Sequence, residues 1–312
     1  MMSVKITING RPVIAQEGIT VLEASKQAGY DIPTLCHHPA LSEFGACRLC
    51  VVEIKGMRNL PASCVTKISE GMEIQTESAA VVEARKTILE LLLANHPSDC
   101  LTCQMSGNCK LQDYAYRYQV RNVSFCGEIH NYPLDDSNPY IIRDNNKCIL
   151  CGRCVRACAE IKGENILGFA SRGFNTKITT ALDKDFKDSD CVYCHTCVAV
   201  CPVGALRNKE MEGKARYWEL EKKTVDCGLC ENACKFDLNI KDGKVIGVSA
   251  KEGTPERFGQ PCLKGRLAVN LKYNPDCPQK PLIKKDGEFV PVSWEEALGL
   301  DELISKMESF EK

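Results

Sequence analysis

Two stretches of the chain each carry four cysteines at the spacing Cys-x2-Cys-x2-Cys-x3-Cys. They are Cys148, Cys151, Cys154 and Cys158, and then Cys191, Cys194, Cys197 and Cys201. Three thiolates this close together suit a cuboidal iron-sulfur cluster better than a zinc ion, which takes its ligands as two separated pairs. In this bacterial pattern the fourth cysteine of each run ligates the cluster of the other run. The spacing therefore predicts one [4Fe-4S] cluster on Cys148, Cys151, Cys154 and Cys201, and a second on Cys191, Cys194, Cys197 and Cys158.

A third set of cysteines follows a predicted β-hairpin and a short helix. Its members are Cys36, Cys47, Cys50 and Cys64. Alternating residues from Val4 to Ile8 and the return from Pro12 to Ala15 flank the turn signal Asn9-Gly10. Val21 to Gly29 then predicts a helix that ends at glycine. This order is typical of a plant-type [2Fe-2S] domain, although the gap after Cys36 is longer than in the short form. A four-cysteine zinc site is the alternative, and the two histidines after Cys36 are expected not to be ligands.

A fourth set combines three cysteines with a histidine. The cysteines are Cys100, Cys103 and Cys109. A helix is predicted from about Ser78 to Asn95, with Ser78 as its N-cap, and it must end before Pro97. His96 then lies at the helix end, facing the cysteines, which need one more ligand for a [4Fe-4S] cluster. His96 is the predicted ligand and Cys126 is the alternative. A histidine ligand removes one negative charge and so raises the reduction potential.

The last set spreads over a longer stretch. It consists of Cys227, Cys230, Cys234 and Cys262. Asp242-Gly243 predicts a hairpin turn between strands over Phe236–Ile240 and Val245–Ala250. A [4Fe-4S] cluster is predicted here too, but zinc is harder to exclude because paired cysteines with a distant fourth are common in zinc ribbons. Of the 21 cysteines, Cys277 is then predicted to be a spare thiol.

Composition predicts several small domains rather than one large core. The cysteine sets recur in blocks of about 50 to 80 residues, a size at which metal binding replaces apolar burial. Residues 131–146 and 209–222 are predicted to be a linker and a charged surface connection. The start of the chain carries no signal-peptide pattern and no stretch is long enough to span a bilayer, so we expect a cytoplasmic protein without direct membrane insertion. The scattered Lys and Arg residues argue against nucleic acid as a partner.

The order of these motifs resembles the front portion of a large electron-transfer family. Its members are the complex I G-type subunit, the cluster domains of NAD-linked formate dehydrogenases, and the iron-sulfur subunits of soluble and electron-bifurcating hydrogenases. The resemblance rests on the double cysteine run, on His96-x3-Cys100-x2-Cys103-x5-Cys109, and on Cys227-x2-Cys230-x3-Cys234 followed by Cys262-Leu263-Lys264-Gly265-Arg266.

The resemblance implies an α+β string of small iron-sulfur domains with one [2Fe-2S] and four [4Fe-4S] clusters. The implied boundaries are a β-grasp [2Fe-2S] ferredoxin domain at 1–78, a helical [4Fe-4S] domain with one histidine and three cysteine ligands and a linker at 79–140, a bacterial double [4Fe-4S] ferredoxin domain at 141–210, a molybdopterin-oxidoreductase-type [4Fe-4S] domain at 220–275, and a tail at 276–312. The tail is similar to the beginning of the pterin-binding catalytic domain, of which we expect only a remnant here.

The missing chemistry narrows the predicted function. No Gly-x-Gly-x-x-Gly turn or P-loop is present for a flavin or nucleotide, so two-electron chemistry is expected on other subunits. The prediction is an electron-transfer subunit, without a substrate-converting site, of a soluble NAD(P)-linked hydrogenase. Implied partners are a flavin and NAD(P)-binding subunit, a thioredoxin-like [2Fe-2S] subunit, a hydrogenase catalytic subunit and, if electrons are bifurcated, soluble ferredoxin. The alternatives are the same role in a formate dehydrogenase complex, or a scaffold that uses metal only to fold.

Overall fold

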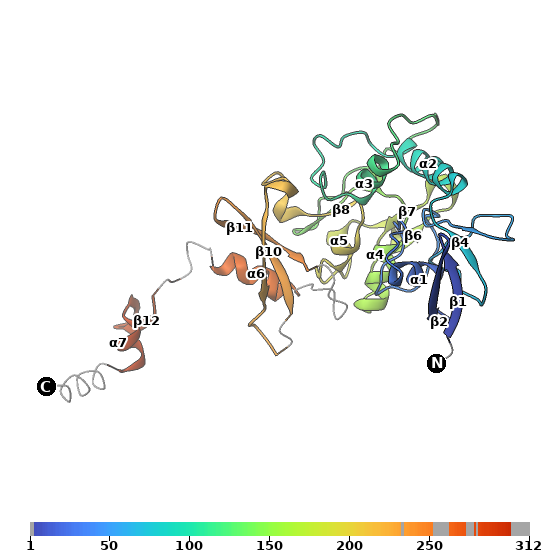
Figure 1. Cartoon of the computed structure of the whole chain (residues 1–312). Coiled ribbons are helices and arrows are strands. Elements are labelled where there is room, and N and C mark those ends of the chain that lie inside the picture. The colour runs from blue at the N-terminus through green and yellow to red at the C-terminus, as the bar shows by residue number, and fades with distance from the viewer. Residues whose placement is uncertain (1–2, 232–233, 252–261, 273–277, 279, 301–312) are drawn as a thin grey trace. The chain divides into compact units, whose positions relative to one another are not determined.

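A hairpin and a helix begin the chain, as the sequence predicts. The computed structural model describes residues 3–231, 234–251, 262–272, 278 and 280–300 (Figure 1). Strands β1 (Ser3–Ile8) and β2 (Arg11–Gln16) pair antiparallel, and the turn residues Asn9 and Gly10 both have positive φ, which a type I′ turn requires. Helix α1 (Val21–Gln27) begins with a capping box between Thr20 and Glu23.

The N-terminal sheet acquires two further strands that the sequence analysis does not predict. They are β3 (Glu53–Ile54) and β4 (Glu73–Gln75), and the strand order is β2-β1-β4-β3, with β4 parallel to β1. Alternate residues of β1 face inward and pack against α1. Cys50 and Cys64 belong to this same buried core, so these two candidate ligands are held in place by packing against the sheet.

Two helices follow, and one buried arginine ties them to the N-terminal domain. Helix α2 (Ala79–Ala94) has Ser78 as its N-cap, as predicted, and α3 is Lys110–Arg117. The fully buried Arg85 on α2 donates hydrogen bonds to the Val51 carbonyl and to the Tyr118 hydroxyl, both at 2.8 Å, and pairs with Glu77 at 2.7 Å. The first two domains are therefore locked together through side chains.

The double cysteine run occupies a layer of short elements. Strand β5 (Ile141–Arg143) pairs antiparallel with β8 (Leu206–Asn208), and β6 (Gly168–Ala170) pairs with β7 (Lys177–Thr179). Helix α4 (Arg153–Arg156) packs against α5 (Thr196–Val200) and the π-helical turn η2 (Ala157–Ile161) (Figure 1). Short 3₁₀ turns connect the rest: η1 (Asn145–Lys147), η3 (Gly173–Asn175), η4 (Ala181–Asp183), η5 (Phe186–Asp188), η6 (Lys209–Met211) and η7 (Tyr217–Glu219).

The prediction of a linker over residues 131–146 is wrong from Asp135 onward. Asn138 is fully buried, and its side-chain oxygen accepts hydrogen bonds from the backbone amides of Tyr140 and Ile141. Asp135 and Arg143 form a buried ion pair at 2.8 Å. The polar residues that suggest a linker therefore satisfy backbone groups inside the domain.

Replacing Asp135 by asparagine is expected to destabilise this domain by about 3 kcal/mol, because an unpaired buried guanidinium remains. Burial opposes ionisation of Asp135, but hydrogen bonds from Ser137 and Phe186 and the charge of Arg143 lower its pKa. Its stabilising contribution is thus present above the usual aspartate range and is lost as the pH falls through the lowered pKa. Thermal unfolding of the cluster-loaded protein checks this. The matched control, E73Q at the exposed Lys55–Glu73 pair, should have little effect, and equal destabilisation by both changes would contradict the prediction.

Within the segment 209–222, predicted as a surface connection, residues 213–219 form a strap over the Cys100–Cys109 loop. Arg216 donates to the carbonyls of Cys103 and Leu101, and the Gln104 side chain donates to the Ala215 carbonyl at 2.8 Å. Trp218 lies so close to Gly107 that a β-carbon there would meet its ring at 2.7 Å. Met211 and Ala215 are buried, so the prediction of a surface connection is wrong.

A three-stranded sheet follows the strap. Strands β10 (Lys235–Lys241) and β11 (Lys244–Ala250) form the predicted hairpin around Asp242-Gly243, and β9 (Glu221–Asp226) adds a strand at the other side of β10. Helix α6 is Leu263–Lys272. The chain divides into two compact units, 1–263 and 264–312.

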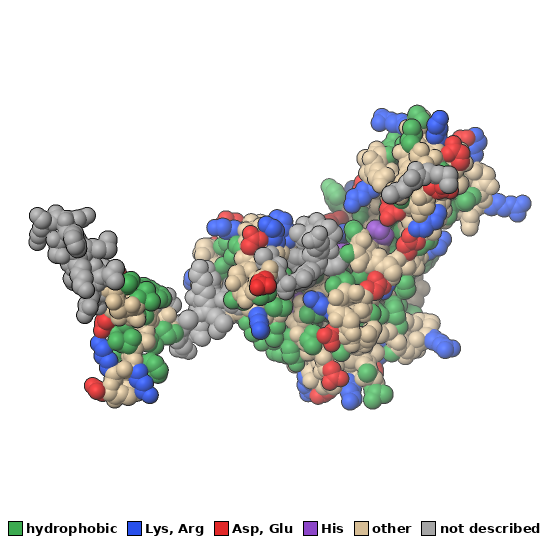
Figure 2. Space-filling view, turned by 90° about the horizontal axis from the view of Figure 1, so that it is seen from below, with side chains coloured by type: hydrophobic (Ala, Val, Ile, Leu, Met, Phe, Trp, Pro, Cys, Tyr) green, Lys and Arg blue, Asp and Glu red, His purple; other side chains and the backbone are tan. Residues whose placement is uncertain are grey.

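The second unit contains a hairpin and a helical turn. Strand β12 (Leu282–Lys285) pairs with β13 (Glu288–Pro291), and α7 (Trp294–Leu298) follows with Ser293 as its N-cap. Cys277, predicted to be a spare thiol, lies outside the described residues. Acidic and basic side chains are interspersed on the face shown in Figure 2. Every helix in the described part of the chain is too short or too polar to cross a membrane.

Candidate metal-cluster sites

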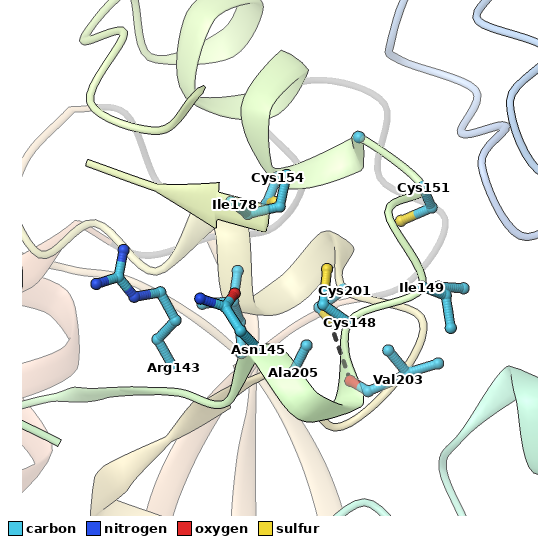
Figure 3. Close-up of a pocket in the computed structure, with 12 residues that line it drawn as sticks. Arg143, Asn145, Cys148, Ile149, Cys151, Cys154, Ile178, Cys201, Val203 and Ala205 are labelled. Atoms are coloured by element: carbon cyan, nitrogen blue, oxygen red, sulfur yellow. Dashed lines mark hydrogen bonds between the residues drawn. The ribbon is translucent and has the colours of Figure 1, made fainter. Parts of the chain in front are cut away.

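Four cysteines from both runs line one cavity beside α4 (Figure 3). They are Cys148, Cys151, Cys154 and Cys201. Cys148 and Cys151 come from the loop that precedes α4, Cys154 lies on α4 itself, and Cys201 caps the end of α5. The remaining walls are largely apolar and include Ile149, Ile178 and Val203. Four thiols facing one cavity are the donor set that a [4Fe-4S] cluster uses, so the residues present fit such a group.

A second cavity gathers the other four cysteines. They are Cys158, Cys191, Cys194 and Cys197. Cys158 belongs to the first run in sequence, but η2 turns it away from its own run and towards the second. The packing of α4 against α5 brings the ends of the two cysteine runs side by side, so the fourth cysteine of each run can face the cavity of the other. Phe186 and Ile141 close this cavity from the side of the β5 strand.

Burial makes the thiolate form of these cysteines costly in the absence of a positive partner. It raises the pKa of Cys148 to about 12 and that of Cys151 to about 11, and it raises the pKa of Cys154 and Cys197 well above the usual thiol value. Iron replaces the proton when a thiolate ligates metal, so metal binding removes this penalty. Backbone amides are already aimed at sulfur: Leu150 N–H donates to Cys148 Sγ at 3.4 Å. Such hydrogen bonds tune cluster potentials.

The N-terminal cysteines lie close enough to share protons. Cys36 is hydrogen-bonded to Cys47 and Cys64, and Cys50 is hydrogen-bonded to Cys64. The hydrogen bond from Cys47 is the main cause that lowers the pKa of Cys36 to about 2, and the one from Cys64 lowers the pKa of Cys50 to about 7. Their partners, Cys47 and Cys64, have raised pKa values because they hold the shared protons. Four converging sulfurs, three of them almost fully buried, fit a compact cluster.

His96 presents an unpartnered nitrogen in the loop after α2. Its Nδ1 lies 3.0 Å from the Pro97 carbonyl oxygen, while Nε2 is buried with no hydrogen-bond partner among the described residues. Burial lowers the pKa of the ring, which favours the neutral form that ligates metal. Cys103 is buried and Cys109 caps α3, whereas Cys100 and the alternative ligand Cys126 are exposed. An orphaned imidazole nitrogen in a cysteine-bearing loop fits a metal ligand.

The fifth set is only partly assembled by the described residues. The Cys227 amide donates to the Cys234 carbonyl at 2.9 Å, and Cys230 and Cys262 are exposed. Residues 232–233 and 252–261 lie outside the described ranges. Within those ranges, no group of three or more His, Cys, Asp or Glu side chains is arranged to hold a single metal ion. A cluster places its ligands around several iron atoms and so needs a wider arrangement than one ion does.

Three buried cations near these sites are missed by sequence reasoning. Lys147 pairs with Asp99 at 2.7 Å, between the His96 loop and the first cavity. Arg153 and Arg156 stand among the cysteines of the first run and are also buried. The available signal is their position among the cysteines: Lys147 and Arg153 each precede a predicted ligand, and Arg156 lies two residues from Cys154 and from Cys158. In sequence they read as ordinary surface residues.

Four family models match successive parts of the chain. They describe a 2Fe-2S iron-sulfur cluster binding domain (residues 2–79), an NADH-ubiquinone oxidoreductase-G iron-sulfur binding region (85–124), an NADH-quinone oxidoreductase subunit 3 ferredoxin-like domain (138–207) and a molybdopterin oxidoreductase Fe4S4 domain (221–274). These matches indicate both 2Fe-2S and 4Fe-4S clusters.

Similar proteins are subunits of larger redox complexes. A G-type NADH-quinone oxidoreductase subunit of Rhizobium meliloti is 35% identical over 94% of this chain and 34% of its own length. The NADP-reducing hydrogenase subunit HndD of Solidesulfovibrio fructosivorans is 42% identical over 67% of this chain and 37% of its own. The chain thus spans about a third of these curated relatives. A chain from the crystal structure of an NAD⁺-reducing [NiFe]-hydrogenase in the H2-reduced state matches with a TM-score of 0.64 and 33% identity, over 69% of this chain and 91% of that one.

Proposed function

The chain belongs to the G-type iron-sulfur subunit family of NADH-quinone oxidoreductases, and on this premise we propose that it carries single electrons between partner subunits of an NAD(P)-linked oxidoreductase complex. The observation that carries this proposal is the pair of four-cysteine cavities. Cysteines of both cavities pack in one hydrophobic core, so two clusters would lie close together in a buried medium. Closely spaced buried clusters suit electron transfer better than a purely structural role.

The proposed complement is one [2Fe-2S] and four [4Fe-4S] clusters. The ligands are the five sets of the sequence analysis, with His96 completing the Cys100, Cys103 and Cys109 site. Its buried, unpartnered Nε2 supports this choice over the exposed Cys126. When bound, the clusters accept and release one electron each, and the protein orients them and excludes water. No proton transfer by this chain is required.

The catalytic partner that we propose is a hydrogenase. The HndD relative and the [NiFe]-hydrogenase structure support it, since both are named as hydrogenases that reduce a nicotinamide nucleotide. A flavin and NAD(P)-binding subunit would exchange electrons with this chain at one end, and a thioredoxin-like [2Fe-2S] subunit would accompany it. Soluble ferredoxin joins the scheme if the complex bifurcates electrons.

Metal analysis of the native complex tests the proposal. We expect at least about 18 iron atoms per copy of this chain for its own one [2Fe-2S] and four [4Fe-4S] clusters, in addition to the iron of the partner subunits, together with nickel and without molybdenum or tungsten. Dithionite should reduce all the clusters, and a nicotinamide nucleotide should reoxidise them within the time of manual mixing. Molybdenum or tungsten would favour a formate dehydrogenase over a hydrogenase as the catalytic partner. Iron well below this number would remove at least one site, and iron that stays redox-silent would contradict the electron-transfer role.

A further inference from the structure

Two buried arginines of α4 join the first cavity to the N-terminal cysteine site. The Arg153 guanidinium donates to the His37 carbonyl. The Arg156 guanidinium donates to the Ser42 carbonyl and, at 2.6 Å, to the carbonyl of Cys36, which is one of the N-terminal candidate ligands. The two side chains thus hold the loop that carries Cys36 against the helix that carries Cys154.

Neither guanidinium is neutralised by a carboxylate within hydrogen-bonding distance. In the described residues their hydrogen-bond acceptors are backbone carbonyls alone, and the Nε atom of each is buried without a partner. Arg153 is 3% exposed and Arg156 is 8% exposed, with the Arg156 guanidinium over the Phe44 ring at 4.9 Å. Arg156 lies near the exposed Glu160, whose pKa its charge helps to lower, whereas the groups that act on Arg153 are cysteines. A buried cation without a nearby anion is strongly disfavoured, so a negative charge is expected close to Arg153.

The ionisable groups that act on Arg153 are cysteines of two different sites, which are anionic when they ligate metal as thiolates. Burial lowers the pKa of Arg153, and negative charge on Cys151 and Cys201 opposes this shift from one side. Cys36 and Cys47 of the N-terminal site oppose it from the other. The guanidinium lies between both sets of candidate ligands, because Arg153 precedes Cys154 on α4 and donates to the carbonyl of His37, the residue after Cys36. Clusters ligated by four cysteines are anionic, about −2 when oxidised, and so supply the missing counter-charge.

We propose that Arg153 is a positioning residue that sets the reduction potentials of the Cys36 site and the Cys148 site together, with Arg156 holding the same loop in place. A fixed cation between two sites stabilises the more negative, reduced form of each, so it raises both potentials. It also keeps the sites adjacent for transfer of one electron from the reduced site to the oxidised one. No bond forms or breaks, and the guanidinium exchanges no proton because it stays charged. This inference rests on the proposed electron-transfer function.

Redox titration followed by EPR, on the full chain within its complex, tests this role. R153Q and R153M remove the charge, and we expect both sites to be about tenfold less reduced at a fixed ambient potential. That is about 59 mV for a one-electron couple, and it follows from one charge at roughly 10 Å in an effective dielectric of about 20. R153K keeps the charge and should recover most of the shift. The matched control is R85Q, which also removes a buried arginine that anchors the N-terminal domain, but one whose charge is paired with Glu77.

The three variants distinguish an effect of the positive charge of Arg153 from an effect of the shape of its side chain. Unchanged potentials in R153Q and R153M, with full iron content, would overturn the proposal. If both neutral variants lose iron while R153K retains it, the positive charge is needed to hold the clusters, which supports the proposal. Loss of iron in all three variants would overturn it, since the shape of the guanidinium and not its charge would be required. If the wild-type protein itself holds no clusters, the failure lies with the proposed function instead.

Discussion

Replacing His96 by alanine is expected to abolish the EPR signal of one [4Fe-4S] cluster and to remove one to about four of the iron atoms. The reason is that Nε2 is buried without a partner among the described residues, so no neighbouring side chain is placed to take over its role. H96C should behave differently. A thiolate restores the fourth ligand but adds a negative charge, so iron content should recover while the reduction potential falls. EPR-monitored titration and iron analysis of both variants make the measurement.

The control for His96 is C126S. Cys126 is exposed, and its loss should leave iron content and every signal unchanged if His96 is the ligand. The opposite pattern, an effect of C126S and none of either His96 variant, would assign the site to the cysteine. A silent result in all three variants would mean that the fourth ligand comes from outside this pair.

Replacing Cys158 by serine is expected to damage the cluster of the second run and to spare that of its own run. Cys158 lines the cavity with Cys191, Cys194 and Cys197, and it does not line the cavity of Cys148 and Cys151. We expect loss of up to about four iron atoms and of one cluster signal. The affected signal should be the one that C194S also removes.

The reciprocal change gives the matched control. Cys201 belongs to the second run but lines the first cavity, so C201S should reproduce the spectrum of C151S and not that of C194S. If C158S instead reproduced C151S, each run would hold its own cluster and the exchange between runs would be wrong. Comparing the spectra and iron losses of the four variants separates these cases without assigning every line of the spectrum.

Elements that obey local rules were predictable from the sequence. The first hairpin follows from alternation around Asn9-Gly10, and α2 follows from its serine N-cap and the proline after His96. The hairpin around Asp242-Gly243 has the same origin. In each case the determining residues lie within a few positions of one another, so no knowledge of distant partners is needed.

Features that depend on distant partners were not predictable. Asp135 reads as a linker residue until Arg143 and the Phe186 amide are placed beside it. Arg153 reads as a surface charge until the carbonyl of His37, more than a hundred residues earlier, is found against it. The grouping of cysteines into sets could be predicted because a cluster imposes a spacing on its ligands. The residues that surround the sulfur atoms in space follow no such spacing in the sequence.

Because of the strap over the Cys100–Cys109 loop, the chain cannot be cut at its domain boundaries without removing contacts within a domain. Residues 213–219 connect the third domain to the fourth in sequence, yet Arg216 and Ala215 hydrogen-bond to the second. A gene fragment cut after the double cysteine run would leave the His96 domain without part of its own cover. A chimaera that takes the His96 domain from one relative must therefore take the strap from the same relative. The sheet of β9, β10 and β11, which follows the strap in sequence, does not impose this requirement.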